Sequence, residues 1–293
     1  MLELLLFVAL GSSEAKMQDD VGPLAKAASN YAKIGEHKVH YKSLGTGATA
    51  LVLVHGWSCD MSFWKQQVPA LAGKIRIVLI DLPGHGKSDR PKIDYTMDLF
   101  ARAVEAVLAD AKVEHAIVAG HSMGTPVARQ YYRLYPKKTK ALIVVDGALR
   151  SLKPDAKAVD KFLAPFEGDG FHQALAKFVD TMFKKDTPAE VRTAVHNKIK
   201  EASQHVAISA MRNVFDPKIW KDDKIEVPVL CLMAKSAFYD EKYEKSVREL
   251  APKVDYRVME SVGHFLMMEQ PRTFNRHLLE FLEKQGFVEK SGD

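Results

Sequence analysis

Short runs of apolar residues alternate along the chain with stretches of helical periodicity. The apolar runs lack the polar alternation of half-exposed strands, which is typical of strands buried on both faces of a parallel sheet. They occupy residues 50–56, 75–84, 115–120, 141–147, 227–234 and 255–260. Amphipathic patterns between them predict helices over residues 62–72, 95–111, 123–135, 240–251 and 271–284. Strand alternating with helix predicts a doubly wound α/β domain.

Two segments depart from this alternation. Residues 30–44 show two short alternating strand patterns around Gly35-Glu36, which predicts a β-hairpin. Residues 151–222 carry several amphipathic helical patterns and no strand pattern, which predicts a helical cap inserted into the domain. We therefore expect one α/β core, preceded by an extension and followed by a short tail. The core spans residues 30–150 and 223–288, the extension 16–29 and the tail 289–293.

The first fifteen residues have the character of an export signal. The apolar run Leu4–Leu10 precedes "SSEA", whose small residues permit cleavage after Ala15. No Lys or Arg precedes the run and Glu3 does, so an uncleaved anchor and an amphipathic extension are alternatives. We expect a signal peptide over residues 1–15 and a periplasmic or secreted protein, with a cytoplasmic protein as the alternative. The run is too short for a stable membrane span.

Composition narrows the possible partners. The 293 residues are 47% hydrophobic and 27% charged with a formal net charge of +5, as in soluble globular proteins. The lysines are spread without a run of five or more, so we expect no nucleic-acid partner. Cys59 and Cys231 lack the spacing of a metal site or a disulfide framework, so we expect no metal. The sequence does not set the oligomeric state.

The sequence "GHSMG", residues 120–124, matches G-x-S-x-G at the junction of a predicted strand and a predicted helix. The flanking glycines let strand and helix approach closely around a strained turn, which exposes the serine hydroxyl. Pro126 fits the first turn of the following helix. Because ligands gather at the carboxyl ends of the strands in such sheets, we expect Ser122 to be a nucleophile. An exposed turn serine is the alternative.

A serine hydroxyl is a poor nucleophile and needs a neighbouring base. Among the 11 histidines, His264 follows the last strand pattern, where its loop would return over the sheet. We expect His264 to be the base. His55 and His121 border the functional turns, and we expect their rings to hydrogen-bond to the backbone.

The tetrahedral intermediate of acyl transfer needs N–H donors for its oxyanion. One expected donor is the backbone of Met123, at the start of the helix after Ser122. The second is the backbone of Trp57, because Gly56 permits a sharp turn after the apolar run at 51–54. A plain strand-to-loop turn is the alternative.

Four motifs in order, "LVLVHGW", "IDLPGHGKSD", "GHSMG" and "SVGHFLMMEQP", resemble those of the capped α/β-hydrolase family. The resemblance covers residues 30–288 and points to the branch of small-ester hydrolases, carbon–carbon bond hydrolases and cofactor-free haloperoxidase-like enzymes. It implies an α/β-hydrolase fold, with a mostly parallel eight-stranded sheet, helices on both faces and a helical cap after the sixth strand. It also implies a triad in the chain order Ser, acid, His, and no cofactor.

The acid of that triad departs from the common family pattern. In most such hydrolases the seventh strand ends in glycine, and the acid follows about three residues later; here Ala234 and Ala237 stand at those places. Asp240 is the nearest later carboxylate and fits a helix N-cap. The family's other arrangement places the acid after the sixth strand, where Asp146 could reach Nδ1 of His264. We predict Asp146 as the acid, with Asp240 or no acid as the alternatives.

These expectations combine into a serine hydrolase that cleaves small or medium carboxylic esters through an acyl-enzyme. The substrate is a small molecule, and its pocket is expected to be mostly apolar. The expected pocket residues are Leu149, Phe265, Phe162, Phe166 and Met211.

Two other functions fit the same sequence. A carbon–carbon bond hydrolase of the same fold would need a basic residue for a substrate carboxylate, and Arg150 could serve or simply face water. A ligand-binding protein on a hydrolase scaffold would account for the missing carboxylate at Ala237. Relatives with an aspartate nucleophile are disfavoured by Ser122, and a P-loop by Asp81 at its first glycine position.

Overall fold

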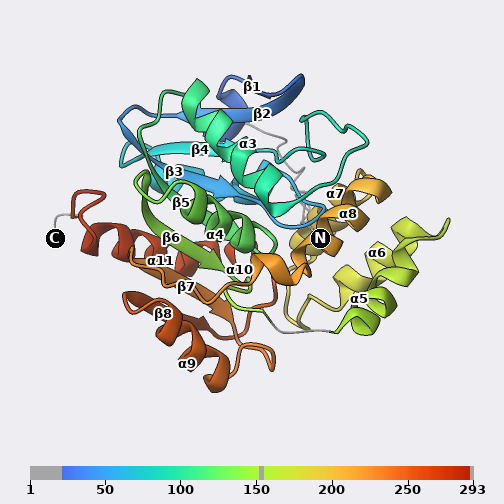
Figure 1. Cartoon of the computed structure of the whole chain (residues 1–293). Helices are drawn as coiled ribbons and strands as arrows, with labels where there is room; N and C mark the ends of the chain where they lie inside the picture. Colours follow the sequence, from blue (N-terminus) through green and yellow to red (C-terminus); the bar gives the residue numbers. More distant parts are fainter. Residues whose placement is uncertain (1–21, 152–154, 291–293) are drawn as a thin grey trace, which may run out of the picture.

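The computed structural model describes residues 22–151 and 155–290, whose eight strands form one sheet (Figure 1). The strand order is β1-β2-β4-β3-β5-β6-β7-β8; the pairs β1–β2 and β2–β4 are antiparallel and all others parallel. The predicted doubly wound α/β fold is therefore confirmed. The strands are β1 (Asn30–Ile34), β2 (His37–Leu44), β3 (Thr49–Val54), β4 (Arg76–Ile80), β5 (His115–His121), β6 (Thr139–Val145), β7 (Val229–Ala234) and β8 (Val254–Met259).

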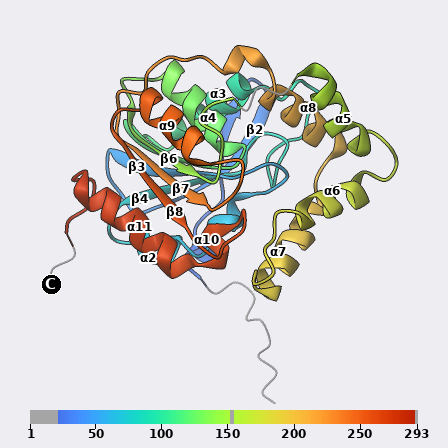
Figure 2. The same ribbon diagram turned by 90° about the horizontal axis from the view of Figure 1, so that it is seen from below.

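Helices cover both faces of the sheet. Figure 2 shows α3, α4 and α9 on one face and α2 and α11 on the other. The helices of the core are α1 (Pro23–Lys26), η1 (Met61–Trp64), α2 (Val68–Leu71), α3 (Met97–Asp110), α4 (Gly124–Leu134), α9 (Glu241–Leu250), α10 (Leu266–Glu269) and α11 (Pro271–Lys284).

Burial along the strands agrees with their apolar sequences, with one exception. Every residue of β7 is buried, as are all but the first residues of β3, β4 and β5. The run at 255–260 was expected to be equally buried, but β8 is an edge strand and Val258 is 44% exposed. An edge strand has only one neighbour, so its residues keep more contact with solvent.

The helix expected over residues 62–72 is two short helices, η1 and α2, rather than one. Pro69 explains the break, because a proline inside a helix lacks an N–H and clashes with the preceding turn. In the structure Pro69 stands in the first turn of α2, where neither penalty applies.

The chain between β6 and β7 forms helices and no strand in its described part. We call residues 155–219 the helical segment; Figure 1 shows it beyond the ends of the strand arrows. It contains α5 (Ala156–Leu163), η2 (Ala164–Phe166), α6 (Phe171–Asp180), α7 (Ala189–Ile199), α8 (Gln204–Val214) and η3 (Pro217–Ile219).

Two arginines of α4 tie both ends of the helical segment to the core. Arg129 is 2% exposed; it donates to the carbonyl of Leu149 before the segment and to the carboxylate of Asp223 after it. Arg133 donates to the same carboxylate, at 2.7 Å, and to the carbonyl of Ile219. Burial lowers the pKa of Arg129 to about 10. The segment thus leaves and re-enters the core beside one helix.

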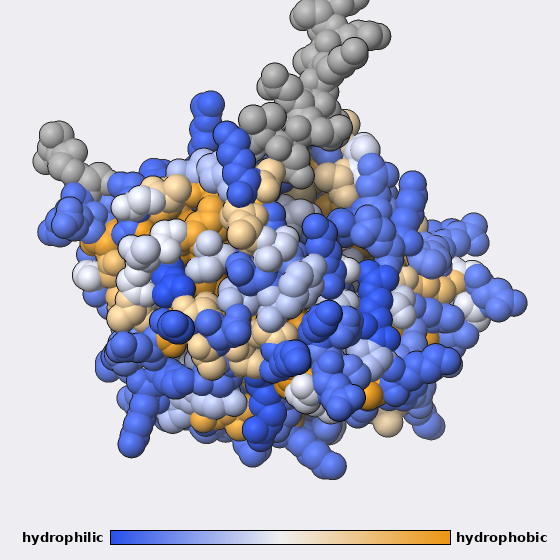
Figure 3. All heavy atoms as spheres, turned by 90° about the horizontal axis from the view of Figure 1, so that it is seen from above, coloured by the Kyte–Doolittle hydropathy of each residue, from blue (hydrophilic) through white to orange (hydrophobic). Residues whose placement is uncertain are grey.

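None of the helices in residues 22–151 and 155–290 is long and apolar enough to cross a membrane. The predicted signal peptide, residues 1–15, lies outside the described residues, as do residues 16–21 of the extension and 291–293 of the tail. Hydrophilic residues cover most of the face seen in Figure 3, and apolar residues appear there in small groups.

We expect Arg129→Ala to lower the free energy of unfolding by about 3 kcal/mol, because the buried carbonyl of Leu149 loses its donor and Asp223 one of its cations. Urea unfolding followed by circular dichroism measures the change. Arg276→Ala is the matched control: this side chain is 60% exposed in its ion pair with Glu280, so about 0.5 kcal/mol or less is expected. Equal losses in the two variants would contradict the tethering role of Arg129.

Candidate active site

Ser122 stands at a strained corner between β5 and α4. Its φ of 53° lies in the left-handed region, which residues other than glycine rarely adopt. The corner is fixed by backbone hydrogen bonds: the N–H of Ser122 donates to the carbonyl of Val145 at 2.9 Å, and the N–H of Thr125 donates to the carbonyl of Ser122 at 2.9 Å. The backbone therefore holds the serine in one orientation at the carboxyl end of the sheet.

The glycines around Ser122 are required by close backbone contacts. A Cβ on Gly120 would lie 2.1 Å from the carbonyl oxygen of Gly124, so β5 and α4 touch backbone to backbone. A Cβ on Gly124 would lie 2.6 Å from the carbonyl oxygen of Val54 in β3. Any side chain at either position would push the helix away from the sheet and move Ser122 with it.

His264 and Asp146 meet across the strand ends. Nδ1 of His264 lies 2.6 Å from Oδ2 of Asp146, whose other oxygen accepts from the N–H of Ala234 at 2.9 Å. The aspartate has a φ of 42° at the end of β6 and is 6% exposed. An ionised carboxylate only accepts hydrogen bonds, so Nδ1 of His264 carries a proton and Nε2 is the basic nitrogen.

Ser122 and His264 lie on the wall of one cavity of about 580 Å³. In the described part of the chain no hydrogen bond joins the serine hydroxyl to the histidine ring. Such bonds are often long before substrate binds. The cavity is also lined by Asp146, so the three predicted triad residues share it.

Glu269, a carboxylate that no sequence motif singled out, holds the loop of His264. Glu269 accepts from the N–H groups on both sides of the histidine, at 2.9 Å from Gly263 and 3.2 Å from Phe265. It also accepts from the hydroxyl of Thr187, in the helical segment, at 2.7 Å. The available signal was an acidic residue in "GHFLMMEQP", close enough in sequence to fold back on the histidine.

The helical segment contacts the same loop a second time. The N–H of His264 donates to the carbonyl of Met182 at 3.1 Å, between α6 and α7. A Cβ on Gly263 would lie 2.5 Å from that oxygen, so only glycine permits this approach. The backbone of the candidate base is thus supported by the core and by the helical segment together.

His121 and His55 hydrogen-bond to backbone groups, as the sequence predicted. Nε2 of His121 lies 2.9 Å from the carbonyl of His264, and the two rings are 4.8 Å apart. His55 accepts from the N–H of Leu82 and donates to the carbonyl of Gly56. Burial lowers the pKa of both rings, so both are neutral donors at neutral pH.

The two predicted oxyanion donors belong to segments that adjoin Ser122. Met123 is the first residue after the serine and stands at the N-terminus of α4. Trp57 follows Gly56, where an added Cβ would lie 3.2 Å from the Cβ of Ser122, so this loop packs directly against the serine. The indole of Trp57 donates to the carbonyl of Ala207 at 2.8 Å, which joins the loop to α8.

Three of the five predicted pocket residues line the large cavity: Phe162, Met211 and Phe265. Phe166 does not line it; its ring packs edge-on against Trp57 at 5.4 Å, behind the wall. Leu149 does not line the large cavity either; it is buried, and its N–H donates to the hydroxyl of Tyr243 at 2.8 Å.

Other lining residues were missed, because the sequence does not show which helix faces turn inward. They include two aromatic residues of the helical segment, a tyrosine after β7 and two lysines: Phe178, Phe215, Tyr239, Lys184 and Lys235.

Asp240, the alternative triad acid, and Arg150, the residue that could bind a substrate carboxylate in a carbon–carbon hydrolase, each have other partners. Asp240 accepts from the N–H of Tyr243 at 2.8 Å and caps α9. Arg150 donates to the carbonyl of Ser246 and forms an ion pair with Asp222, and it does not line the large cavity.

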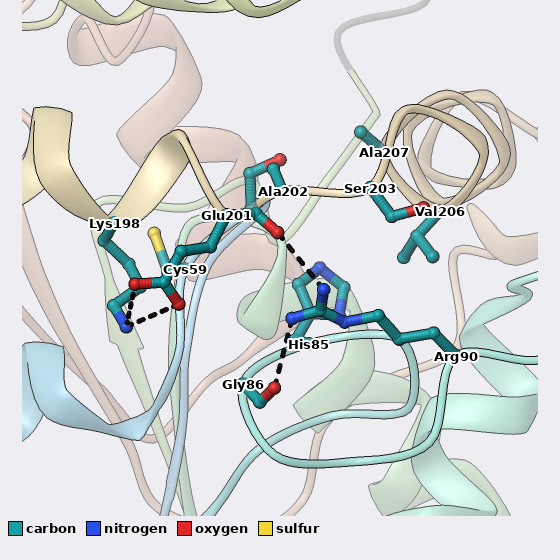
Figure 4. A pocket seen from close by; sticks show the side chains of 12 residues that line it. Cys59, His85, Gly86, Arg90, Lys198, Glu201, Ala202, Ser203, Val206 and Ala207 are labelled. Carbon is teal, nitrogen blue, oxygen red and sulfur yellow. Dashed lines mark hydrogen bonds and ion pairs between the residues drawn. The ribbon is translucent and has the colours of Figure 1, made fainter.

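A small cavity of about 20 Å³ marks the contact between core loops and α7–α8 (Figure 4). Arg90 donates to the carbonyls of Gly86 and Glu201 there. Lys198 pairs with Glu201 at 3.0 Å and with Asp60 at 2.8 Å. Burial disfavours the charged form of Lys198, but the carboxylates of Asp60 and Glu201 outweigh this effect and raise the pKa of Lys198. The contact fastens the helical segment to the core.

No group of three or more His, Cys, Asp or Glu side chains within residues 22–151 and 155–290 is arranged to hold a metal ion.

Comparisons with known proteins show the family of this chain and agree with its fold. The alpha/beta hydrolase family model matches residues 51–277. The 2-hydroxy-6-oxononadienedioate/2-hydroxy-6-oxononatrienedioate hydrolase of Burkholderia vietnamiensis is 27% identical over 293 residues, covering 92% of this chain and 100% of that protein.

Two solved structures share the fold. An esterase from Exiguobacterium antarcticum has a TM-score of 0.78 at 21% identity, covering 87% of this chain and 100% of that one. The enol-lactonase from Burkholderia xenovorans has a TM-score of 0.75 at 20% identity, covering 86% and 99%. Because the family match spans most of its length, this chain is an enzyme of the alpha/beta hydrolase family.

Proposed function

We propose that this enzyme is a serine hydrolase that cleaves carboxylic esters with Ser122, His264 and Asp146. The observation that supports it most directly is the 2.6 Å contact between Nδ1 of His264 and Asp146, on the wall of the cavity that Ser122 also lines. A buried carboxylate at this nitrogen selects the tautomer in which Nε2 is basic, and that is the state a serine nucleophile needs.

In the acylation step, Nε2 of His264 takes the proton of Ser122 as the hydroxyl oxygen attacks the ester carbonyl. The N–H groups of Trp57 and Met123 stabilise the oxyanion, and Asp146 stabilises the imidazolium. The imidazolium then donates its proton to the departing alkoxide, which leaves as the alcohol. The acid part of the ester stays bound to Ser122.

In the deacylation step, His264 takes a proton from water as the water oxygen attacks the acyl-enzyme. The second tetrahedral intermediate is held by the same two N–H groups. Its collapse returns the proton to Ser122 and releases the acid. Both steps use side chains, backbone groups and water alone.

The helical segment serves in this proposal as the predicted cap. Aromatic side chains that it contributes, among them Phe162, Phe178 and Phe215, line the cavity above the strand ends. Apolar walls of this kind favour an uncharged ester over a charged substrate. The volume of about 580 Å³ accommodates small and medium esters.

A carbon–carbon bond hydrolase is the second candidate. The Burkholderia vietnamiensis relative is named for a dienedioate, a dicarboxylate, and Lys184 and Lys235 on the cavity wall could attract one. The two functions separate on substrates: an ester hydrolase turns over p-nitrophenyl butyrate, and a carbon–carbon hydrolase prefers a vinylogous diketone acid.

We expect Asp146→Asn to lower kcat for p-nitrophenyl butyrate by about 10⁴-fold, because an amide at this position favours the wrong tautomer of His264. Release of p-nitrophenol measures the rate. Asp240→Asn is the matched control; asparagine also caps helices, so its kcat is expected to stay within about twofold. If Asp240→Asn fell and Asp146→Asn did not, the acid would be assigned wrongly. Full turnover by Ser122→Ala would contradict the proposed mechanism, in which Ser122 is the nucleophile.

We expect Glu269→Gln to lower kcat by about tenfold with little change in KM, because a neutral amide has one acceptor oxygen for three donors and lets the His264 loop move. Steady-state kinetics measure both constants. Glu244→Gln, on the exposed face of α9, is the control and should match the wild type. A tenfold rise in KM at unchanged kcat would argue against a role in placing the base.

A further inference from the structure

Two cavities of unequal size meet at Ser122. The larger holds about 580 Å³, and a second cavity holds about 150 Å³. Both are lined by Ser122 and Asp146, and by three side chains that stand between the two spaces: Met211, Phe215 and Tyr239. A carbonyl group bound at Ser122 therefore has two separate spaces for the groups on its two sides.

The two cavities differ in which parts of the catalytic machinery they contain. His264 and Trp57 line the larger cavity and not the smaller one. Met123 and Pro126, at the N-terminus of α4, line the smaller cavity and not the larger one. His264, the general base and acid of the proposed mechanism, is thus on the side of the larger cavity.

This asymmetry decides which group of an ester enters which cavity. The bond between the carbonyl carbon and the alcohol oxygen breaks as His264 protonates that oxygen, so the alcohol must lie beside the histidine. The acyl chain must then extend away from His264. Building on the function proposed above, we infer that the smaller cavity binds the acyl group and the larger cavity binds the alcohol.

The volume of the smaller cavity limits the acyl group. An apolar protein cavity of about 150 Å³ holds one benzene molecule. The wall formed by Val214 and Trp220 is braced, because the indole of Trp220 donates to the carbonyl of Val214 at 2.8 Å. The acyl group that this cavity holds is therefore about the size of a benzene ring or smaller, and a long fatty acyl chain would have to extend out of the cavity.

Charge separates the two cavities further. Asp146 is the one charged side chain among the described residues that line the smaller cavity, and it would repel a carboxylate there. The larger cavity is lined by the aromatic residues Phe162 and Phe178 and by Lys184 and Lys235, and the ammonium group of Lys235 forms an ion pair with Glu260 at 3.1 Å. The substrate class is an ester of a short, uncharged acid with a bulky, apolar alcohol.

Two series of esters test this assignment on the full chain. The acyl series is p-nitrophenyl acetate, butyrate and octanoate. The alcohol series is ethyl, hexyl and 2-(2-naphthyl)ethyl acetate, whose leaving alcohols have similar acidity. We expect kcat/KM to fall by about tenfold or more from butyrate to octanoate, and to rise by about tenfold or more from ethyl to naphthylethyl acetate.

Two variants assign each cavity to its group. Val214→Phe narrows the smaller cavity and should lower the butyrate-to-acetate ratio of kcat/KM by about fivefold or more, with the naphthylethyl-to-ethyl ratio unchanged. Phe178→Trp narrows the larger cavity. It should lower the naphthylethyl-to-ethyl ratio of kcat/KM by about fivefold or more and leave the butyrate-to-acetate ratio unchanged. Far-UV circular dichroism and labelling of Ser122 by a methylphosphonate ester show whether each variant is folded.

The outcomes separate this inference from the proposed function. Turnover that prefers octanoate, or variants whose effects fall on the opposite series, would overturn the cavity assignment and leave the serine hydrolase standing. Wild-type protein that neither hydrolyses any of the six esters nor reacts with the phosphonate would overturn the proposed function, and the cavity assignment with it.

Discussion

The contact between the backbones of β5 and α4 is the constraint on which the rest of the candidate site depends. Gly120 and Gly124 have no room for a Cβ, so strand and helix meet without side chains between them. That contact forces Ser122 into a left-handed conformation at the carboxyl end of the sheet. The N-terminus of α4 is brought beside the serine at the same time, which is where the proposed mechanism needs an N–H donor for the oxyanion.

The candidate base is held by groups from distant parts of the chain. Asp146 and His264 are 118 residues apart and meet because β6 and β8 end at the same edge of the sheet. Glu269 holds the backbone on both sides of the histidine and reaches Thr187 in the helical segment. A movement of the helical segment would therefore displace the histidine as well as the cavity wall.

The helical segment has two kinds of attachment. At its ends, Arg129 and Arg133 hold the chain against α4 through buried or half-buried hydrogen bonds. Along its length, Lys198 pairs with Asp60 of the core. Between these attachments it presents an apolar wall to the strand ends, and the space left there is divided at Ser122 into a large and a small part.

The sequence by itself determined the features that depend on local chemistry. Buried parallel strands need continuous apolar runs, and a strained strand-to-helix turn needs glycines, so the fold and the position of Ser122 could be predicted from short motifs. The tertiary structure decided which side chains meet across the chain. Glu269 was missed, Leu149 and Phe166 lie outside the cavity, and Phe178 and Tyr239 line it. Helix rotation and loop return set these contacts, and both depend on packing between segments far apart in sequence, which no local pattern records.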